Sequence, residues 1–444
     1  GKSSTVSATM QRLTNTVMAY PWGSTQDLAA LRGLPPSEKP EAELWMGAHP
    51  NAPSSLDDGR PLDAAIASGP VEFLGTAIAA EFGRLPFLLK LLAAAEPLSL
   101  QAHPSKAQAE AGFAHEEALG IPRAAPHRNY KDNNHKPELV CALTPFWALC
   151  GFREPAESAA LLRALEVDAL APIVTLLDAG NLREAFLTLL GVTGETRAAL
   201  VRPAVAAAKA RRPTAKTDPY FWLARLGDAY ADDAGAITSL LLNLLELKPN
   251  QALYLPAGNL HAYLEGFAVE IMAASDNVLR GGLTPKYVDR EELAKVLDIA
   301  PYAVVVFEPA VGTDHFAHYR TPARDFALAR YEAGGASVGK AGDAEFDAKA
   351  FSDPASRRAE TNASVREAGD GAESDATASA ASGPIHGPAI VVAIGPGTTI
   401  ATDGTQLMAL APSEALFLAA DAAPITLQGG TAFVATVGQG ELAL

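Results

Sequence analysis

Cysteine, positive charge and long apolar runs are all scarce in this sequence of 444 residues. Its two cysteines, Cys141 and Cys150, are too few for a disulfide framework and match no CxxC motif, so we expect buried thiols in a protein of the reducing cytoplasm. The 35 Lys and Arg residues against 51 Asp and Glu residues leave a net charge of -16, which argues against nucleic acid as a partner. No apolar run reaches the roughly 18 residues of a membrane span, and the first residues lack the apolar segment of a signal peptide, so no membrane partner is expected.

Apolar residues are abundant, and their spacing divides the chain. Residues 1–153 are expected to form the N-terminal part of a β-rich domain, which residues 248–310 complete. Between them, residues 154–247 repeat apolar residues at helical spacing, as in an inserted helical domain. Residues 311–444 return to short strands with Gly-rich turns, a pattern typical of a small β-barrel or jelly roll. The predicted fold class is therefore mainly β with an α insertion.

Several local elements are marked by their apolar pattern and by proline. Residues 61–82 predict one or two short helices. The apolar run that follows predicts two buried strands with a bend at Ala93–Pro97, and Pro104 ends the second strand before a helix. Residues 287–298 predict an amphipathic helix capped by Asp289.

Residues 341–385 differ in composition from the rest of the C-terminal part. They contain nine acidic residues against four basic ones, a net charge of -5, among repeated Ala, Ser and Gly with few apolar residues. This composition predicts a flexible acidic insertion at the surface.

The stretch from His261 to Lys286 concentrates chemically active side chains. It holds a His, three acids, an Arg, a Lys and a Gly pair. Its first half alternates as a strand does, and its second half, SDNVLRGGLTPK, is too rich in Gly, Asn and Pro for a helix or a central strand. We expect a strand that ends in a wide loop at the rim of a pocket, where catalytic and binding residues often lie.

Four polar residues predict a metal site: Gln101, His103, Glu138 and His261. Gln101 and His103 lie two residues apart, so they share one face of a strand. Glu138 begins another strand after Pro137, and His261 follows a Pro-Ala-Gly-Asn turn. Nitrogen and oxygen ligands without thiolate suit Zn²⁺, Mn²⁺ or Fe²⁺, and a single carboxylate leaves a divalent ion with net positive charge, which keeps it a good Lewis acid.

Other histidines are weaker candidates. His315 and His318 lie three residues apart, so on a strand they would point to opposite faces, and we expect both to be structural. His49 and His135 are candidates for groups beside the metal ligands or for proton transfer.

Basic residues accompany the same segments: Lys106, Lys136, Arg280 and Lys286. A cation cluster beside a metal in an acidic protein indicates an anionic substrate. A phosphate monoester fits because it carries roughly -1.5 to -2 charges at pH 7. Ser105 offers a hydroxyl donor for the same anion, and the Gly281-Gly282 pair lets the backbone approach a ligand closely.

Two longer motifs identify a family. YKDNNHKPE (Tyr130 to Glu138) and HAYLEGFAVEIMAASDNVLRGGLTPK resemble the two signature segments of the type I mannose-6-phosphate isomerases, also called phosphomannose isomerases. EPLSLQAHP, AELWMGAHP and AYPWGS resemble further blocks of that family. The resemblance runs from about Ala19 to Asp298, and more weakly through the C-terminal strands. It departs at Gly281, where the family usually has Ala, and says nothing of the acidic insertion.

The resemblance implies cupin-type β-barrels (jelly rolls) with an inserted helical domain, and one Zn²⁺ per chain. It implies an enzyme that interconverts D-mannose 6-phosphate and D-fructose 6-phosphate, feeding mannose metabolism and GDP-mannose synthesis. Gln101, His103, Glu138 and His261 match the family's zinc ligands, and Arg280 matches its active-site Arg. The expected partner is a small-molecule sugar phosphate, and we expect a monomer, with an oligomer left open.

The base of such an isomerisation is not identified by the sequence. The reaction moves a proton between C1 and C2 through an enediol, which requires a base, an electrophile and an anchor for the phosphate. Arg280 keeps its charge, so it suits oxyanion or phosphate stabilisation and not proton abstraction. Glu270, Lys136 and His135 are the candidates for the base, with Glu270 first because burial near a metal would tune a carboxylate toward neutral pH.

Two other functions stay open. A cupin metalloenzyme of another kind, such as an iron oxygenase, would favour a His-rich triad with open positions and would not need the Lys and Arg cluster. A non-catalytic sugar-phosphate-binding cupin could lose Glu138 or Arg280 without cost, whereas both are present.

Overall fold

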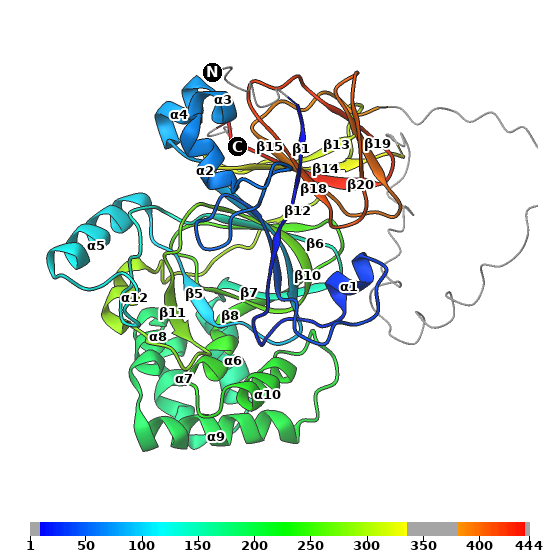
Figure 1. Cartoon of the computed structure of the whole chain (residues 1–444). Helices are drawn as coiled ribbons and strands as arrows, with labels where there is room; N and C mark the ends of the chain where they lie inside the picture. The colour runs from blue at the N-terminus through cyan, green and yellow to red at the C-terminus, as the bar shows by residue number, and fades with distance from the viewer. Residues whose placement is uncertain (1–8, 335–380, 440–444) are drawn as a thin grey trace, which may run out of the picture.

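The computed structural model describes residues 9–334 and 381–439 of the chain. Figure 1 shows a helical region (green) below, a large central sheet, and a smaller β unit (orange and red) above. The mainly β architecture with a helical region between two β-rich stretches agrees with the sequence prediction.

The central sheet is antiparallel and has eleven strands. Seven run in the order β12-β9-β6-β10-β4-β3-β2; β5 and β7 also pair with β10, β11 pairs with β5, and β8 pairs with β7. In chain order they are β2 (Thr16–Met18), β3 (Glu43–Gly47), β4 (Phe87–Ala94), β5 (Leu100–Ala102), β6 (Glu138–Ala142), β7 (Phe146–Phe152), β8 (Leu242–Leu247), β9 (Ala252–Leu255), β10 (His261–Ala273), β11 (Leu279–Gly282) and β12 (Val306–Phe307). The two buried strands predicted on either side of Ala93–Pro97 are β4 and β5.

Both faces of the central sheet are covered, and they bury different side chains. On β4, whose eight residues are all buried, Leu89 and Leu91 join a core cluster shared with Phe417 and Phe433 of the upper unit. Lys90, between them, points to the opposite face. One face of this sheet therefore supplies the shared apolar core, and the other is available to line a site.

Strand β10 links two parts of the central sheet. His261–Glu265 pair with β5 and β7, and the remainder of the strand pairs with β4 and β6. The change falls at a β-bulge next to Gly266, which has a φ of 136° and would place a Cβ 2.7 Å from the Phe146 ring. Only glycine fits this position, so a single strand presents both His261 and Glu270.

The wide loop predicted after β10 is interrupted by a strand. Leu279 and Arg280 of β11 pair with Ala102 and Gln101 of β5. The Gly and Asn content favours a loop, but the open edge of β5 offers partners for these backbone groups, and pairing with it decides the conformation.

The helical region lies between β7 and β8 and packs on one end of the central sheet. It consists of α6 (Pro155–Arg163), η1 (Asp168–Leu170), α7 (Ala171–Asp178), α8 (Leu182–Gly191), α9 (Gly194–Ala210), α10 (Pro219–Ala229), α11 (Gly235–Thr238) and η2 (Ser239–Leu241). Its core joins Phe186 and Trp222 to Phe152 of β7 and Leu100 of β5. The predicted helical stretch is wrong at its end, because Leu242–Leu247 forms β8 and pairs with β7. The apolar run there suits a buried helix and a buried strand equally, so the partner strand decides.

The upper unit contains a six-stranded sheet, β1-β18-β15-β20-β14-β13, and a three-stranded sheet, β17-β16-β19, both antiparallel. The strands are β1 (Gln11–Leu13), β13 (Phe316–Tyr319), β14 (Ala327–Glu332), β15 (Ala389–Ala393), β16 (Thr399–Thr402), β17 (Leu407–Leu410), β18 (Ala415–Leu418), β19 (Thr426–Gln428) and β20 (Thr431–Thr436). The short strands predicted for the C-terminal part are thus present.

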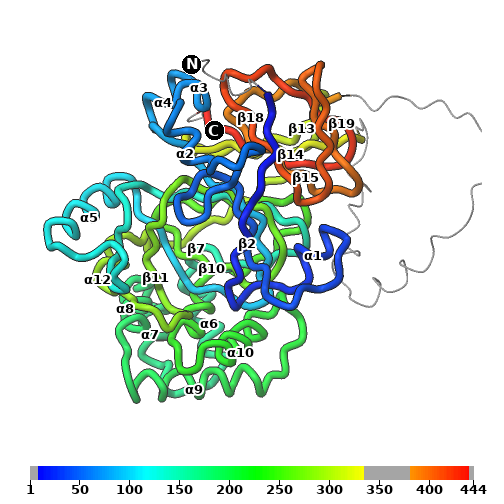
Figure 2. Tube along the Cα trace, viewed as in Figure 1, coloured from blue at the N-terminus to red at the C-terminus, as the bar shows by residue number. Residues whose placement is uncertain are grey.

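Two predicted boundaries differ from the structure. Strand β1, expected within the first β-rich domain, pairs with β18, so the N-terminal segment runs from the upper unit to β2 in the central sheet (Figure 2). Most of the acidic insertion predicted at 341–385 lies outside the described residues. Its predicted end is too late, because Ile385 is buried in the upper unit and pairs with Ile425.

Further helices flank the sheets: α1 (Asp27–Leu31), α2 (Leu62–Ser68), α3 (Pro70–Leu74), α4 (Thr76–Phe82), α5 (Lys106–Ala118) and α12 (Arg290–Val296). Residues 61–82 form three helices, not one or two, because Gly69 and Gly75 separate them. The carboxylate of Asp289 caps α12, as predicted, by accepting a hydrogen bond from the Glu292 amide. Among the helices of the described residues, none combines the length and apolar character that a membrane crossing requires.

Candidate active site

Three of the four predicted metal ligands meet in the central sheet. His103 follows β5, Glu138 is the first residue of β6, and His261 is the first residue of β10. One ligand atom from each lies within 4.8 Å of the others, and all three side chains are buried. Residues 158 positions apart in the sequence therefore converge on one point.

The hydrogen bonds of the two imidazoles leave both inner nitrogen atoms without a partner. Nδ1 of His103 donates to the Asn277 carbonyl oxygen at 2.8 Å, and Nδ1 of His261 donates to the Asn259 carbonyl oxygen at 3.0 Å. The Nε2 atoms are buried, have no hydrogen-bond partner among the described residues, and lie 3.3 Å from the Glu138 carboxylate. With the proton on Nδ1, two lone pairs and a carboxylate face one another. A cation between them removes this repulsion, so the donor set fits a zinc ion.

The local electrostatics favour the metal-binding protonation states. Burial lowers the pKa of His103, which keeps its imidazole neutral. Burial opposes the ionisation of Glu138, but its neighbours, among them the Lys136 ammonium 3.7 Å away, hold the pKa of that carboxyl well below its usual range. Metal ligands must be deprotonated, so both shifts favour metal binding.

The fourth predicted ligand, Gln101, lies beside these residues. In the antiparallel ladders it is directly opposite His261 on β10 and directly opposite Arg280 on β11. Residues directly opposite each other share a face of a sheet. Gln101 therefore lies between a metal residue and the predicted active-site Arg.

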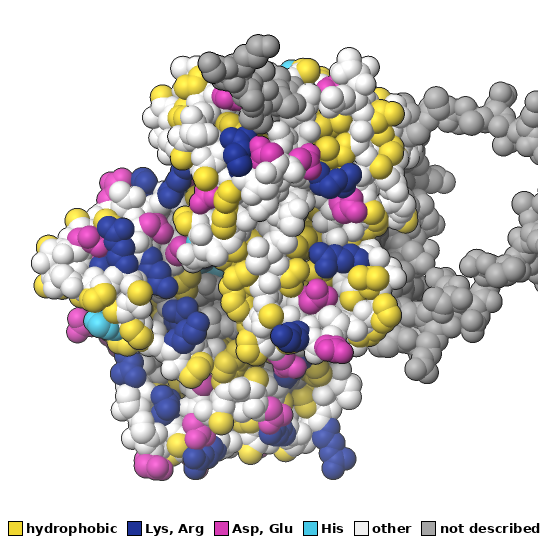
Figure 3. Space-filling model, in the orientation of Figure 1, with side chains coloured by type: hydrophobic (Ala, Val, Ile, Leu, Met, Phe, Trp, Pro, Cys, Tyr) yellow, Lys and Arg dark blue, Asp and Glu magenta, His cyan; other side chains and the backbone are white. Residues whose placement is uncertain are grey.

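A cavity of about 760 Å³ adjoins the metal residues. Predicted site residues line it: Gln101, Glu138, Lys136, Glu270, Arg280 and Lys286. Its size is in the range of small-molecule sites. On the face shown in Figure 3, Lys and Arg side chains (dark blue) lie around a hollow between α5 and the central sheet.

The cations of the cavity are held in surroundings that favour a bound anion. Burial lowers the pKa of Arg280 and of Lys286, and the charges of Arg280 and Lys131 lower that of Lys286 further. A negative group beside them opposes these shifts, because it favours the charged forms. This arrangement suits a phosphate.

A second group of buried charges lines the same cavity. Lys90 on β4 is directly opposite Glu270 on β10; its Nζ lies 3.9 Å from the Glu270 carboxylate and 3.4 Å from that of Glu43. The ammonium also lies 4.9 Å from the centre of the Trp45 ring. Burial works against this charge, but Glu43 and Glu270 outweigh it and raise the pKa of Lys90, so the lysine stays protonated.

Glu270 is the carboxyl of this group whose pKa lies near neutrality. The Tyr263 hydroxyl donates a 2.5 Å hydrogen bond to its Oε2. Burial, followed by the negative charge of Glu138, raises the pKa of Glu270 to about 7. A buried carboxyl that lines a cavity and titrates near pH 7 is suited to proton transfer.

Two predicted substrate contacts are placed elsewhere. Ser105 is the N-cap of α5, and its hydroxyl accepts a hydrogen bond from the Gln108 amide. The Lys106 ammonium is half exposed and donates to Asn134. Neither is among the residues that line the cavity. Both residues lie close to the metal ligands in sequence but do not line this cavity, so their contact with a substrate stays a prediction.

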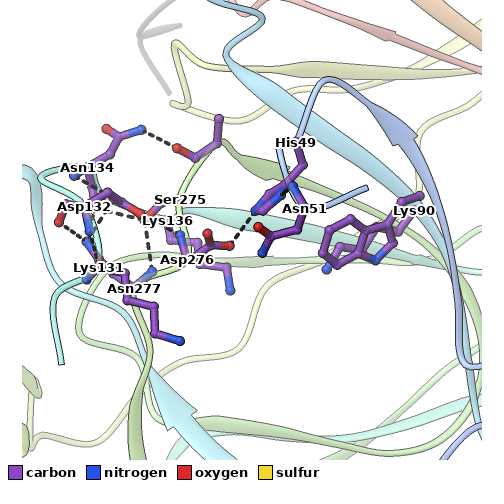
Figure 4. A network of polar contacts seen from close by, with 12 residues as sticks. His49, Asn51, Lys90, Lys131, Asp132, Asn134, Lys136, Ser275, Asp276 and Asn277 are labelled. Carbon is purple, nitrogen blue, oxygen red and sulfur yellow. Dashed lines mark hydrogen bonds and ion pairs between the residues drawn. The ribbon is translucent and has the colours of Figure 1, made fainter. Parts of the chain in front are cut away.

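The remaining predicted histidines are each paired with an acid or a carbonyl. His135, a candidate base, does not line the cavity and lies 2.7 Å from Asp325 at the junction with the upper unit, so we assign it no proton transfer from substrate. His49 lies 2.8 Å from Asp276 (Figure 4). His315 is buried and donates to a backbone carbonyl, whereas His318 is exposed, so the two rings do not form a site together.

Lys90, Glu43 and Tyr263 are cavity residues that the sequence analysis missed. A signal was present for Lys90, which is the only charged residue in the apolar stretch FLLKLLAA. Lysine is almost never fully buried unless it is paired, so a lysine within a strand of this kind indicates a buried acid nearby. Which acids it meets depends on strand pairing.

Comparisons with known proteins agree with this site. Residues 10–155 match the family described as phosphomannose isomerase type I, catalytic domain. The chain is 45% identical over 307 residues to the mannose-6-phosphate isomerase of Salmonella typhimurium, covering 68% of this chain and 75% of that protein. It is 33% identical over 354 residues to the rat mannose-6-phosphate isomerase, covering 72% and 81%.

Solved structures show the same fold over nearly the whole chain. A mannose 6-phosphate isomerase bound with zinc and yttrium superimposes with a TM-score of 0.79 at 35% identity, covering 97% of this chain and 99% of that one. A zinc-bound form of mannose 6-phosphate isomerase gives the same values. Together with the buried His-Glu-His group beside a cation-lined cavity, these similarities show that the chain belongs to the family of type I mannose-6-phosphate isomerases.

Proposed function

We propose that this chain is a zinc-dependent isomerase that interconverts D-mannose 6-phosphate and D-fructose 6-phosphate through an enediol. The observation that carries the proposal is the group of His103, Glu138 and His261 beside a cavity that also holds Glu270 and Arg280. Moving a proton between C1 and C2 of a phosphorylated sugar requires a base, a stabiliser of the developing oxyanion and an anchor for the phosphate. All three are available around this one cavity.

The zinc ion would be held by Gln101, His103, Glu138 and His261. When bound, it supplies a Lewis acid that polarises the sugar oxygens. The carbonyl partners of the two histidines fix each ring with Nε2 toward the ion. Since one chain supplies the whole ligand set and the cavity, a monomer with one zinc ion suffices.

The other residues of the cavity divide the remaining tasks. Arg280 and Lys286 bind the phosphate or the developing oxyanion, because their pKa values are lowered by burial and an anion relieves that cost. Glu270 is the base that removes the proton from C2 or C1, since its pKa of about 7 matches proton transfer near neutral pH. Lys90 stays charged and stabilises Glu270 in its ionised form.

Lys136 is the alternative base. Its Nζ lies 3.7 Å from Glu138, and the side chain lines the cavity. In this ion pair the ammonium offers only hydrogen-bond donors, which suits it to contact a sugar oxygen beside the metal residues. We therefore assign Lys136 to hydrogen bonding with a sugar oxygen and Glu270 to proton abstraction.

We further infer that the two β units are cupin-type barrels of the jelly-roll kind. The first is formed by the strands from β2 to β7 together with β8 to β12, and the helical domain is inserted in it; the second is formed by β1 together with β13 to β20. Their antiparallel sheets support this inference. Two buried free cysteines, Cys141 and Cys150, support a place in the reducing cytoplasm.

The test is an isomerase assay with metal analysis on the same sample. We expect chelation to abolish the conversion of mannose 6-phosphate to fructose 6-phosphate and added Zn²⁺ to restore it. Full activity in metal-free protein would contradict the role of zinc. Binding of mannose 6-phosphate by the zinc-loaded protein without conversion would identify a non-catalytic sugar-phosphate-binding protein.

A further inference from the structure

Two loops that are far apart in the sequence are fastened together beside the metal residues. Residues 131–137 lead into β6, and residues 274–278 connect β10 to β11. Figure 4 shows the polar network between them. We call its members the loop clamp: Asp132, Asn134, Ser275 and Asn277.

Asn277 is the centre of the loop clamp. Its side chain is 1% exposed. Oδ1 accepts hydrogen bonds from the backbone amides of Lys131 and Asp132, at 2.8 and 3.2 Å. Nδ2 donates to the backbone carbonyls of Asp132 and Asn134, both at 2.8 Å. One buried amide group thus forms hydrogen bonds with four backbone groups of the opposite loop.

Asp132 fastens the two loops in the opposite direction. Its Oδ1 accepts from the Ser275 hydroxyl and its Oδ2 from the Asp276 amide, both at 2.8 Å. The Ser275 hydroxyl oxygen in turn accepts a hydrogen bond from the backbone amide of Asn277 at 3.1 Å. Each loop therefore supplies side chains that bind the backbone of the other, which leaves the pair of loops little freedom to slide.

The main chain of Asn277 reaches the metal site directly. Its carbonyl oxygen accepts the 2.8 Å hydrogen bond from Nδ1 of His103. That bond keeps the proton on Nδ1 and points Nε2 of His103 toward Glu138. On the other loop, Glu138 follows Asn134 by four residues. A shift of one loop relative to the other therefore moves the Asn277 carbonyl, the partner of His103, relative to Glu138.

We propose that Asn277 is the positioning residue for this metal site: its side chain holds the two loops in register so that its carbonyl orients His103 for the ion. The inference rests on the proposed zinc-dependent function and adds a residue whose side-chain hydrogen bonds all go to the loop of residues 131–137. Groups that orient metal-binding histidines typically contribute about 10- to 100-fold to metal affinity.

The test compares Asn277→Ala with the unmodified full-length chain by zinc competition against a chromogenic chelator. We expect the zinc dissociation constant to rise about 10- to 100-fold. In the metal-free protein, the ¹H–¹⁵N spectrum of His103 should show less of the form with the proton on Nδ1. At saturating zinc, kcat for mannose 6-phosphate should fall more than KM rises, because Arg280 and Lys286 remain in place.

Asn129→Ala is the matched control. Asn129 lies just before the loop clamp, and its Nδ2 donates to Asp289 at 2.8 Å. It is a partly buried Asn whose bond does not join the two loops. We expect its zinc dissociation constant to stay within about twofold of the unmodified value, as for substitutions that lie away from a site.

Ser275→Ala keeps the test decisive where Asn277→Ala does not fold, as judged by circular dichroism. It removes one link of the loop clamp and should weaken zinc binding in the same direction by a smaller factor. The proposal is overturned if Asn277→Ala folds and its zinc affinity is unchanged or falls only as much as that of Asn129→Ala. If Asn277→Ala does not fold, an unchanged zinc affinity of Ser275→Ala overturns it. An unmodified chain that binds zinc without isomerase activity contradicts the proposed function but leaves this comparison valid; a chain that binds no zinc overturns both.

Discussion

Two fully buried strands show how differently the two β units use their interiors. Strand β4 of the central sheet reads FLLKLLAA, and β15 of the upper unit reads AIVVA. All residues of both are buried, but β15 contributes only aliphatic side chains to the core, whereas β4 places Lys90 beside Glu43 and Glu270. Burying a charge costs several kcal/mol unless partners compensate it. A single lysine therefore distinguishes a strand that builds a site from a strand that only builds a core.

The histidines repeat this contrast. In the central sheet His103 and His261 present unpartnered nitrogens to the same carboxylate. In the upper unit His315 donates to the Glu332 carbonyl and His318 pairs with Asp314. Similar antiparallel frameworks thus hold a metal-type site in one case and ordinary structural histidines in the other, so the chemistry depends on side chains and not on the framework.

The largest effect is expected for Glu270→Gln. Loss of the base should lower turnover about 10²- to 10⁴-fold, because Gln cannot accept the proton from carbon. The measurement is exchange of the C2 proton of mannose 6-phosphate with solvent. Glu265→Gln is the control, since Glu265 lies on the same strand but pairs with Arg225 at 2.9 Å in the helical region. Unchanged exchange in Glu270→Gln would remove it as the base.

Lys90→Met tests the cost of the buried charges. At pH 8 it leaves Glu43 and Glu270 without their cation and should lower the free energy of unfolding by about 3–5 kcal/mol. In the metal-free protein the pKa of Glu270 is raised from 4.5 to about 7, so the folded protein binds this proton more tightly than the unfolded chain does. The resulting stabilisation of the folded protein is complete below pH 4.5 and is lost as the pH rises through 7. The loss in Lys90→Met should therefore be smaller at pH 5, where Glu270 is protonated.

Chemical denaturation of the metal-free proteins at both pH values measures this loss. Leu91→Met on the same strand faces the apolar core and should cost less than about 1.5 kcal/mol at either pH. If Lys90→Met lost more free energy of unfolding at pH 5 than at pH 8, Glu270 could not be the acid whose charged form Lys90 stabilises.

Arg280→Ala tests whether the cation of β11 acts in the reaction or in the fold. Turnover should fall about 10²- to 10³-fold, as when one stabilising donor of a transition state is removed, while the zinc content stays intact. Arg202→Ala, which removes an exposed pair with Asp232, should leave turnover unchanged. Loss of zinc from Arg280→Ala would show instead that the residue is structural.

The smallest effect is expected for Gly281→Ala, which introduces the alanine that is usual in the family at this position. A Cβ there would lie 3.1 Å from Leu260 and 3.4 Å from Leu293, so side chains need shift only slightly. Stability should change by less than about 1 kcal/mol. Gly282→Ala is the contrasting variant, since its φ of 132° is strained for alanine. Equal thermal stabilities of the two variants would contradict this reading.

Much of the fold could be predicted because it follows local patterns. The helical spacing after residue 154 and the strand-like stretches on either side reflect periodicities that any buried face imposes. The predictions were wrong where pairing between distant segments decides: Leu242–Leu247 suits a helix by its apolar pattern but becomes a strand against β7. Likewise, the pairing of β1 with β18 depends on an edge about 400 residues away.

For the site, the chemical types of the metal residues could be predicted from the residues alone, since two His, one Glu and one Gln in non-helical segments suit a divalent ion. The sequence did not determine which charges gather around them. Lys90 meets Glu43 and Glu270 because β4 lies between β3 and β10 in one register, and Asn277 reaches His103 because two loops interlock. Such contacts depend on the tertiary structure, because a shift of one residue between strands would turn every side chain to the other face.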